Sequence, residues 1–151
     1  MSSNMNHLSF SPGSIEFSLE ELDSAAATIG GLLDKHKLCY VGLKGELGAG
    51  KTTFVGALLR LWGLDPELPV PSPTFTCVQE YDLAIGAVAH CDFYRIDNPA
   101  QELAGLLDHR EFARALIEWP KNLVESGELD ILLRFEATGE SSRKISWAAC
   151  S

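Results

Sequence analysis

The sequence predicts an α/β domain with a mostly parallel central sheet, and three observations lead to this fold class. Segments with helical spacing of apolar residues alternate with short apolar runs bounded by glycine or proline. The length of 151 residues suits one domain. Hydrophobic residues at 46% and charged residues at 22% exclude disorder, collagen and coiled coil as dominant states. We expect residues 14–151 to form a single domain, preceded by a flexible tail over residues 1–13.

The first half of the chain is expected to form a strand, a helix, a buried strand and a second helix, over residues 14–18, 19–33, 38–44 and 51–62. Ser18 and Glu21 have the spacing of a capping box at a helix start. Gly45 ends the buried apolar run, and Gly63 ends the apolar stripe of the second helix. Residues 64–74 hold four of the seven prolines, so they are expected to form a stiff, non-helical loop.

The second half is expected to form two strands, a helix, a short strand and a terminal hairpin, over residues 75–83, 87–96, 99–107, 115–119, 129–137 and 144–150. A turn around Gly86 separates the first two strands, and Pro99 suits the first turn of the helix. Pro120 stops the short apolar strand. A turn over residues 138–142 joins the last two strands, which would add antiparallel strands at the C-terminal side of the sheet.

The most informative motif lies between the first buried strand and the second helix, and it reads Gly45-Glu46-Leu47-Gly48-Ala49-Gly50-Lys51-Thr52. It matches the phosphate-binding pattern G-x-x-x-x-G-K-[ST] at every position and in the required strand–loop–helix setting. Its glycines let successive N–H groups turn inward toward phosphate oxygens. Lys51 would contact the β- and γ-phosphates, Thr52 would hold Mg²⁺, and Thr53 would contact the α-phosphate. The motif predicts a three-layer P-loop NTPase fold that binds a nucleoside triphosphate with Mg²⁺; the alternative is a glycine-rich turn with an incidental lysine.

Two apolar runs end in an acid, and a carboxylate at the end of a buried strand can hold the metal of a P-loop site or its waters. Asp92 ends one run and Glu118 ends the other. Pro120 stops the chain soon after Glu118, which places this carboxylate at the carboxyl edge of the sheet, where open α/β sheets bind ligands. The alternatives are a solvated strand-end acid for Glu118 and a structural ion pair with Arg95 for Asp92.

Polar residues near these acids form a second group of candidates. Thr74 follows the P-loop helix in the segment where NTPases sense the γ-phosphate, so its hydroxyl is a candidate contact for metal, phosphate or attacking water. The alternative is a rigid connector in which Thr74 starts a strand. His90, Asp92 and Tyr94 alternate, so they are expected to share one strand face, either as a catalytic or partner-facing cluster or as a structural network. Trp119 either stacks near the nucleotide or, as the simpler expectation, is buried in the core.

The net charge is −9, with 12 Lys and Arg against 21 Asp and Glu, which argues against a protein that grips nucleic acid directly. The sequence has no run of 18 apolar residues, so we expect no membrane span. The N-terminus lacks the pattern of a signal peptide. The four cysteines form no C-x-x-C pair, so we expect reduced thiols, no zinc site and a cytoplasmic location: Cys39, Cys77, Cys91 and Cys150.

Four segments together resemble the TsaE family, the small bacterial ATPases of tRNA threonylcarbamoyladenosine biosynthesis: GELGAGKTT at 45–53, VPSPTFT at 70–76, HCDFYR at 90–95 and IEWP at 117–120. The resemblance covers about residues 14–150. One departure is Leu107, since the family commonly ends an E-L-x-x-L-G stretch with glycine there.

This resemblance implies slow hydrolysis of ATP and association with the transferase subunits TsaD and TsaB, which modify adenosine 37 of tRNAs that read ANN codons. Contact with tRNA would then be indirect, through the complex. By the family pattern, Lys51 and Thr52 are the phosphate and Mg²⁺ residues, Glu118 is a Mg²⁺ ligand, Asp92 is a catalytic-site acid, and Thr74 lies in a switch-like segment.

Two other classes of function stay open at this point. A small-molecule kinase could use the same P-loop, but such kinases usually need an arginine-rich lid. The chain has six arginines, of which Arg110 and Arg114 are the only close pair, and it is short for a core plus lid. A nucleotide-sensing binding module is the other alternative, although the intact set of Lys51, Thr52, Asp92 and Glu118 favours chemistry.

Overall fold

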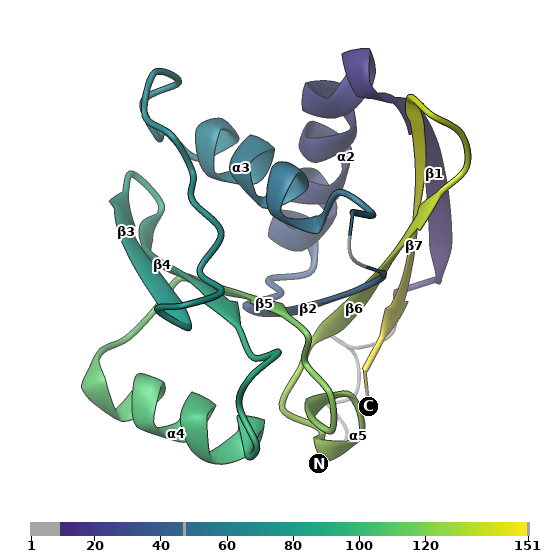
Figure 1. The fold of residues 1–151 in the computed structure, drawn as a ribbon. Helices are drawn as coiled ribbons and strands as arrows, with labels where there is room; N and C mark the ends of the chain where they lie inside the picture. Colours follow the sequence, from purple (N-terminus) through teal and green to yellow (C-terminus); the bar gives the residue numbers. More distant parts are fainter. Residues whose placement is uncertain (1–9, 47, 151) are drawn as a thin grey trace.

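The computed structural model describes residues 10–46 and 48–150, and its centre is a seven-stranded sheet in the order β1-β7-β6-β2-β5-β4-β3 (Figure 1). The strands are β1 Gly13–Ser18, β2 Tyr40–Lys44, β3 Val78–Leu83, β4 Gly86–Asp92, β5 Arg114–Glu118, β6 Ile131–Ala137 and β7 Ser142–Ala149. The four central strands β6, β2, β5 and β4 run parallel, and antiparallel strands flank them on both sides. The predicted α/β class with antiparallel C-terminal strands is confirmed.

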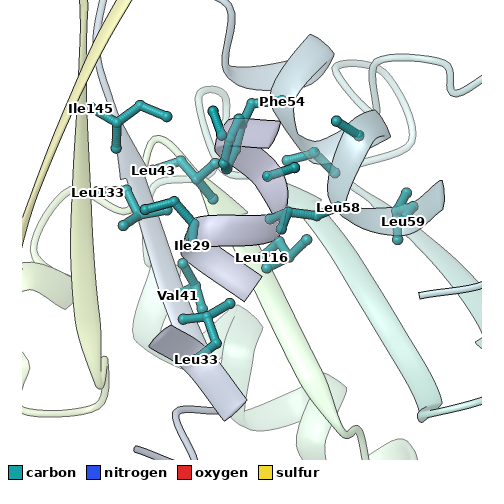
Figure 2. Packing of buried hydrophobic residues seen from close by; sticks show 14 of the residues in the cluster. Ile29, Leu33, Val41, Leu43, Phe54, Leu58, Leu59, Leu116, Leu133 and Ile145 are labelled. Atoms are coloured by element: carbon teal, nitrogen blue, oxygen red, sulfur yellow. The ribbon is translucent and has the colours of Figure 1, made fainter. Parts of the chain in front are cut away.

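Helices cover both faces of this sheet (Figure 1). They are the 3-10 helix η1 Leu19–Glu21 and the α-helices α2 Leu22–Lys35, α3 Lys51–Leu61, α4 Pro99–His109 and α5 Leu123–Ser126. On one face, Ile29 and Leu33 of α2 and Phe54 of α3 pack in one fully buried cluster with apolar side chains of the sheet (Figure 2). On the other face, Leu103 of α4 and Leu123 of α5 belong to a second buried cluster. Burial of this apolar surface stabilises the three layers.

Several predicted boundaries need correction, and local hydrogen bonds give the reason. The first helix begins with a 3-10 turn, whose start is held by the N–H of Ser18 donating to Glu21 at 2.9 Å. The strand predicted from residue 75 begins only at Val78, because residues 73–77 form a turn closed by the N–H of Cys77 on the Pro73 carbonyl at 2.7 Å.

The strand predicted over residues 87–96 ends at Asp92. There the side chain of Asp92 accepts a hydrogen bond from the N–H of Tyr94 at 2.9 Å, which turns the chain out of the sheet. The short helix α5 was not predicted, since four residues are too few to show helical periodicity. Phe10, near the end of the expected tail, is buried with its ring centroid 5.2 Å from that of His36.

Two further expectations concern the cysteines and the membrane. All four cysteines are free thiols; Cys91 and Cys150 are buried, whereas Cys39 and Cys77 are half-buried. Burial raises the pKa of the Cys91 thiol well above its ordinary value, so this side chain is an inert part of the core. No helix in the described part of the chain is both long enough and apolar enough to cross a membrane.

Candidate functional site

A cavity of about 310 Å³ lies at the carboxyl ends of the parallel strands, beside the start of α3. It brings together most residues that the sequence singled out, although they come from separate parts of the chain: Glu46, Gly48, Ala49, Gly50, Lys51, Thr52, Thr53, Thr74, Asp92 and Glu118. Gly45 is adjacent in the same loop. Leu47, which also belongs to the predicted motif, lies outside the described residues.

The glycines of the P-loop have conformations that side chains would disturb. Gly48 and Gly50 have φ angles of 81° and 98°, in the left-handed region that favours glycine. A Cβ at Gly45 would lie 2.8 Å from the backbone oxygen of Phe135 in β6. The close approach of β6 therefore favours glycine at position 45. Helix α3 begins directly after Gly50. Its first turn leaves N–H groups without intrahelical partners, which is the usual anion site at a helix start.

Lys51 is buried at the base of this loop. Its ammonium group donates to the carbonyls of Gly45 and Glu46, and its Nζ lies 4.3 Å from the ring centroid of Trp119. Burial lowers the pKa of Lys51, while the negative charges of Glu118 and Asp92 act in the opposite direction. The cation is therefore held against the loop and an aromatic face, close to the carboxylates across the cavity.

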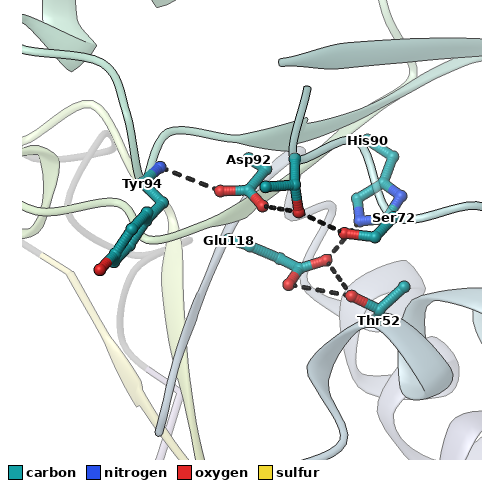
Figure 3. Close-up of polar contacts among 7 residues, drawn as sticks. Thr52, Ser72, His90, Asp92, Tyr94 and Glu118 are labelled. Carbon is teal, nitrogen blue, oxygen red and sulfur yellow. Dashed lines mark hydrogen bonds and ion pairs between the residues drawn. The ribbon is translucent and has the colours of Figure 1, made fainter. Parts of the chain in front are cut away.

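The strand register places the two acids side by side, because Asp92 of β4 pairs with Glu118 of β5. Both carboxylates are buried, with 4% and 3% of their surface exposed. Glu118 accepts from the hydroxyl of Thr52 at 2.9 and 3.1 Å, and Asp92 accepts from the hydroxyl of Thr74 at 3.0 Å (Figure 3). A buried carboxylate needs such donors, since losing water without compensation is costly.

His90 contacts Glu118 from outside the cavity lining. Its side chain is completely buried in β4, and Nε2 lies 2.6 Å from Glu118 Oε2 (Figure 3). An ionised carboxylate can only accept a hydrogen bond, so the imidazole is the donor. His90 Nδ1 is buried and has no partner in the described part of the structure. His90 therefore belongs to a buried hydrogen-bond network that holds Glu118.

The structure removes several alternatives. Arg95 does not pair with Asp92; its guanidinium carbon lies 4.8 Å from the ring centroid of Phe75 instead. Glu118 is not a solvated strand-end acid, and Thr74 does not start a strand. Tyr94 does not share a strand face with His90 and Asp92, because β4 ends at Asp92 and the Tyr94 side chain is 51% exposed.

Trp119 was expected, as the simpler alternative, to be buried in the core, and this expectation is wrong. It is half-buried, lines the cavity, and has a φ angle of 57°, which is strained for a bulky side chain. Its ring packs edge-on against that of Tyr94, with centroids 5.0 Å apart. The turn after Glu118 therefore aims the indole at the P-loop instead of the core.

Sequence reasoning missed the residues that complete the cavity wall: Phe17, Leu19, Leu22, Ser72, Phe135 and Arg143. Arg143 is the second residue of β7 and donates to the carbonyls of Gly139 and Ser142 at 3.2 and 2.8 Å. Its buried Nε has no hydrogen-bond partner among the described residues. No local motif marks this arginine, because only the hairpin β6–β7 brings it to the P-loop.

The oxygen donors of Thr52 and Glu118 fit a hard cation such as Mg²⁺. Within residues 10–46 and 48–150, no group of three or more His, Cys, Asp or Glu side chains is arranged to hold a metal. This agrees with Mg²⁺ chemistry, in which one or two protein oxygens share the ion with water and substrate phosphates.

Comparison with known proteins adds independent findings. The family model described as "Threonylcarbamoyl adenosine biosynthesis protein TsaE" matches residues 17–145. The chain is 36% identical to the tRNA threonylcarbamoyladenosine biosynthesis protein TsaE of Haemophilus influenzae over 124 residues, covering 80% of this chain and 77% of that protein. It is 37% identical to TsaE of Aquifex aeolicus over 106 residues, covering 68% and 71% of the two chains.

The fold has a matching experimental structure. The crystal structure of YdiB from Bacillus subtilis superposes with a TM-score of 0.65 at 24% identity, covering 95% of this chain and 90% of that chain. At this identity the match supports the fold alone. The family-model match spans the segments that form the cavity described above, and the sequence relatives agree with it. The chain therefore belongs to the TsaE family of threonylcarbamoyladenosine biosynthesis proteins.

Proposed function

We propose that this protein binds ATP with Mg²⁺ at its P-loop and hydrolyses it slowly to ADP and phosphate. The observation that carries this proposal is the convergence of Lys51, Thr52, Asp92 and Glu118 on one cavity at the start of α3. The hydrolysis would support formation of threonylcarbamoyladenosine at position 37 of tRNAs that read ANN codons. The protein would act in the cytoplasm with the TsaD–TsaB pair, which would hold the tRNA.

The P-loop side of the cavity would bind the phosphates. The N–H groups of the loop and of the first turn of α3 offer donors to phosphate oxygens. When the nucleotide binds, the Lys51 ammonium would leave the carbonyl oxygens of Gly45 and Glu46 and bind the β- and γ-phosphates instead. Arg143, whose Nε lacks a partner among the described residues, offers another donor at the same wall. These local devices would bind a polyanion despite a net charge of −9.

Thr52 of the first turn of α3 and Glu118 at the end of β5 would hold Mg²⁺ between them. When bound there, Mg²⁺ supplies positive charge that offsets the charge on the phosphate oxygens. His90 acts as a positioning residue, since its 2.6 Å contact fixes the orientation of the Glu118 carboxylate. Because His90 and Glu118 are both buried, their contact would keep the metal-binding oxygens of Glu118 in place before the nucleotide arrives.

Asp92 and Thr74 would act on the attacking water. Asp92 is buried but lines the cavity, and its carboxylate lies beside that of Glu118 in the strand register. It would orient a water and accept its proton. The hydroxyl of Thr74 donates to Asp92 at 3.0 Å, so the proline-rich loop sets the position of this acid.

A small-molecule kinase would usually need an arginine-rich lid, and the close pair of arginines does not provide one. The close pair Arg110 and Arg114 is engaged far from the P-loop in sequence and structure: Arg110 pairs with Glu80 and Asp82, and Arg114 pairs with Asp34. Neither arginine lines the cavity. Arg110 and Arg114 therefore do not form a lid that could clamp a second phosphorylated substrate over the cavity.

Phosphate release from Mg-ATP tests the proposal, measured for the protein alone, with the TsaD–TsaB pair, and with small-molecule acceptors. We expect slow release alone and faster release with the pair. The Lys51→Ala variant should lose at least about 100-fold in turnover. Lys35→Ala is the control, since this exposed lysine lies outside the cavity, and circular dichroism should verify folding of both variants. Phosphate transfer that depends on a small-molecule acceptor would establish a kinase instead, and ATP binding without turnover would establish a sensor.

A further inference from the structure

A second cavity, of about 510 Å³, opens next to the P-loop cavity and shares Glu46, Trp119 and Phe135 with it. Its remaining wall comes from the end of β2, from β6, from the segment after β4, and from α5 with the segment before it. It therefore lies at the same carboxyl edge of the sheet where open α/β proteins bind ligands. Apart from the P-loop residues Gly45 and Glu46, its lining residues have no assigned role toward ATP or Mg²⁺.

The cavity gathers cations on a strongly acidic protein. Lys44 and Arg134 are direct neighbours in the parallel register of β2 and β6, and both are exposed. In the described part of the chain, neither side chain has an ion pair or a hydrogen bond. Adjacent like charges repel each other, so this arrangement is unfavourable until an anion joins it.

A third cation and one acid complete the charges at this wall. Lys121 donates to the carbonyls of Tyr94 and Ile96 at 2.9 and 2.6 Å, so its ammonium is fixed in place without being neutralised. Glu46 is the one acid that lines the cavity. The described wall thus has an excess of positive charge, in contrast to the net charge of −9 for the whole chain.

The same wall presents exposed aromatic surface. The Tyr94 side chain is 51% exposed and packs edge-on against Trp119. Trp119 in turn contacts the ammonium of Lys51, 4.3 Å from its ring centroid. A bound group that contacts Tyr94 and Trp119 would therefore be separated from Lys51 only by the indole ring of Trp119.

We propose that this second cavity is the docking site for an acidic segment of a protein partner, with carboxylates for Lys44 and Arg134 and an apolar side chain for the Tyr94–Trp119 pair. The proposal rests on the partner dependence in the proposed function. Charge complementarity favours a short acidic peptide segment, because three cations can neutralise only a few negative charges. RNA is disfavoured, since tight binding to a polyanion takes many phosphate contacts.

This position also explains how a partner would affect ATP turnover. Trp119 and Glu46 line both cavities, so binding in one changes the surroundings of the other. Coupling of this kind is reciprocal: if the partner changes nucleotide affinity, Mg-ATP changes partner affinity by the same factor.

The test compares the wild type with the double variant Lys44→Gln and Arg134→Gln in binding to the purified TsaD–TsaB pair. We expect at least a tenfold loss of affinity, a weaker salt dependence, and a basal Mg-ATP hydrolysis within twofold of the wild type. The matched control is Lys35→Gln with Lys37→Gln, which removes two exposed lysines that line neither cavity and should leave partner affinity unchanged.

Equal partner affinity of wild type and double variant would overturn the docking site, as would a wild type that does not bind the pair. A double variant that binds the pair normally but loses affinity for isolated tRNA would assign the cavity to RNA instead. The affinity measurement is independent of catalysis. A wild type that binds the pair but never releases phosphate would therefore refute the ATPase proposal while leaving the docking site supported by its affinity loss.

Discussion

The two cavities at the carboxyl edge of the sheet differ in how their charges are balanced. In the P-loop cavity, each buried acid has protein donors: Thr52 and His90 hold Glu118, and Thr74 holds Asp92. In the second cavity, the exposed cations Lys44 and Arg134 stand next to each other without an ion pair in the described structure. The first cavity is organised before its ligand arrives, whereas the second depends on an outside anion.

This difference follows from burial. The acids of the first cavity are buried, so unpaired carboxylates there would cost several kcal/mol and the fold must supply partners. The cations of the second cavity are exposed, where water screens repulsion and the cost of leaving them unpaired is small. Preorganisation suits chemistry, and an exposed excess of charge suits recognition of a partner.

The largest effect should come from Glu118→Gln, which keeps the shape of the side chain but removes the negative charge. We expect ATP turnover to fall by about 100-fold or more, because a neutral amide holds Mg²⁺ poorly. Phosphate release measures the effect, and Glu128→Gln provides a matched exposed control. Unchanged turnover in Glu118→Gln would transfer the metal role to Asp92.

The next effect should come from His90, which contacts neither cavity directly. His90→Phe leaves Glu118 without its buried donor, so the Mg²⁺ concentration for half-maximal turnover should rise about tenfold, as for other groups that orient a metal ligand. His90→Gln, whose amide can still donate, should recover part of the loss. A Mg²⁺ requirement equal to that of the wild type in His90→Phe would show that this contact only stabilises the fold.

Trp119→Ala should affect both cavities, since the indole lines each of them. We expect several-fold losses in nucleotide affinity and in affinity for the TsaD–TsaB pair. Calorimetric titration with each ligand separates the two effects. A loss confined to one ligand would show that the two cavities work independently and would break the proposed coupling.

The smallest effect should come from Arg134→Gln alone. Removing one of two adjacent cations relieves their repulsion, so the urea midpoint of unfolding should stay equal or rise slightly. Thr52→Val, which removes the hydroxyl donor of buried Glu118, should lower the midpoint instead. A clear drop for Arg134→Gln would mean that this arginine already has a stabilising partner in the free protein.

Local pattern predicted most of the fold. The strand–glycine loop–helix order around Lys51, the proline loop and the C-terminal hairpin all follow from residues close in sequence, and the structure confirms them. The turns at Cys77 and Tyr94 were missed because each is closed by a specific hydrogen bond within a segment whose composition resembles a strand.

The positions of the two acids in the sheet could be predicted from the sequence, for a physical reason. Asp92 and Glu118 end apolar runs, so their position at the edge of a parallel sheet follows from the pattern. Arg143 and the second cavity could not be predicted in this way. They depend on β6 lying beside β2 and on β7 folding back, which is a matter of strand order and not of local sequence.

Diffraction from crystals grown with Mn²⁺ and a non-hydrolysable ATP analogue would test the metal site most directly, since manganese has an anomalous signal. We predict a single manganese peak within bonding distance of the Thr52 hydroxyl oxygen, with Glu118 bound directly or through one water. The Lys51 ammonium should then have left the Gly45 carbonyl for the phosphates. A manganese ion held by Asp92 without Glu118, or an analogue bound outside the P-loop cavity, would contradict the proposed site.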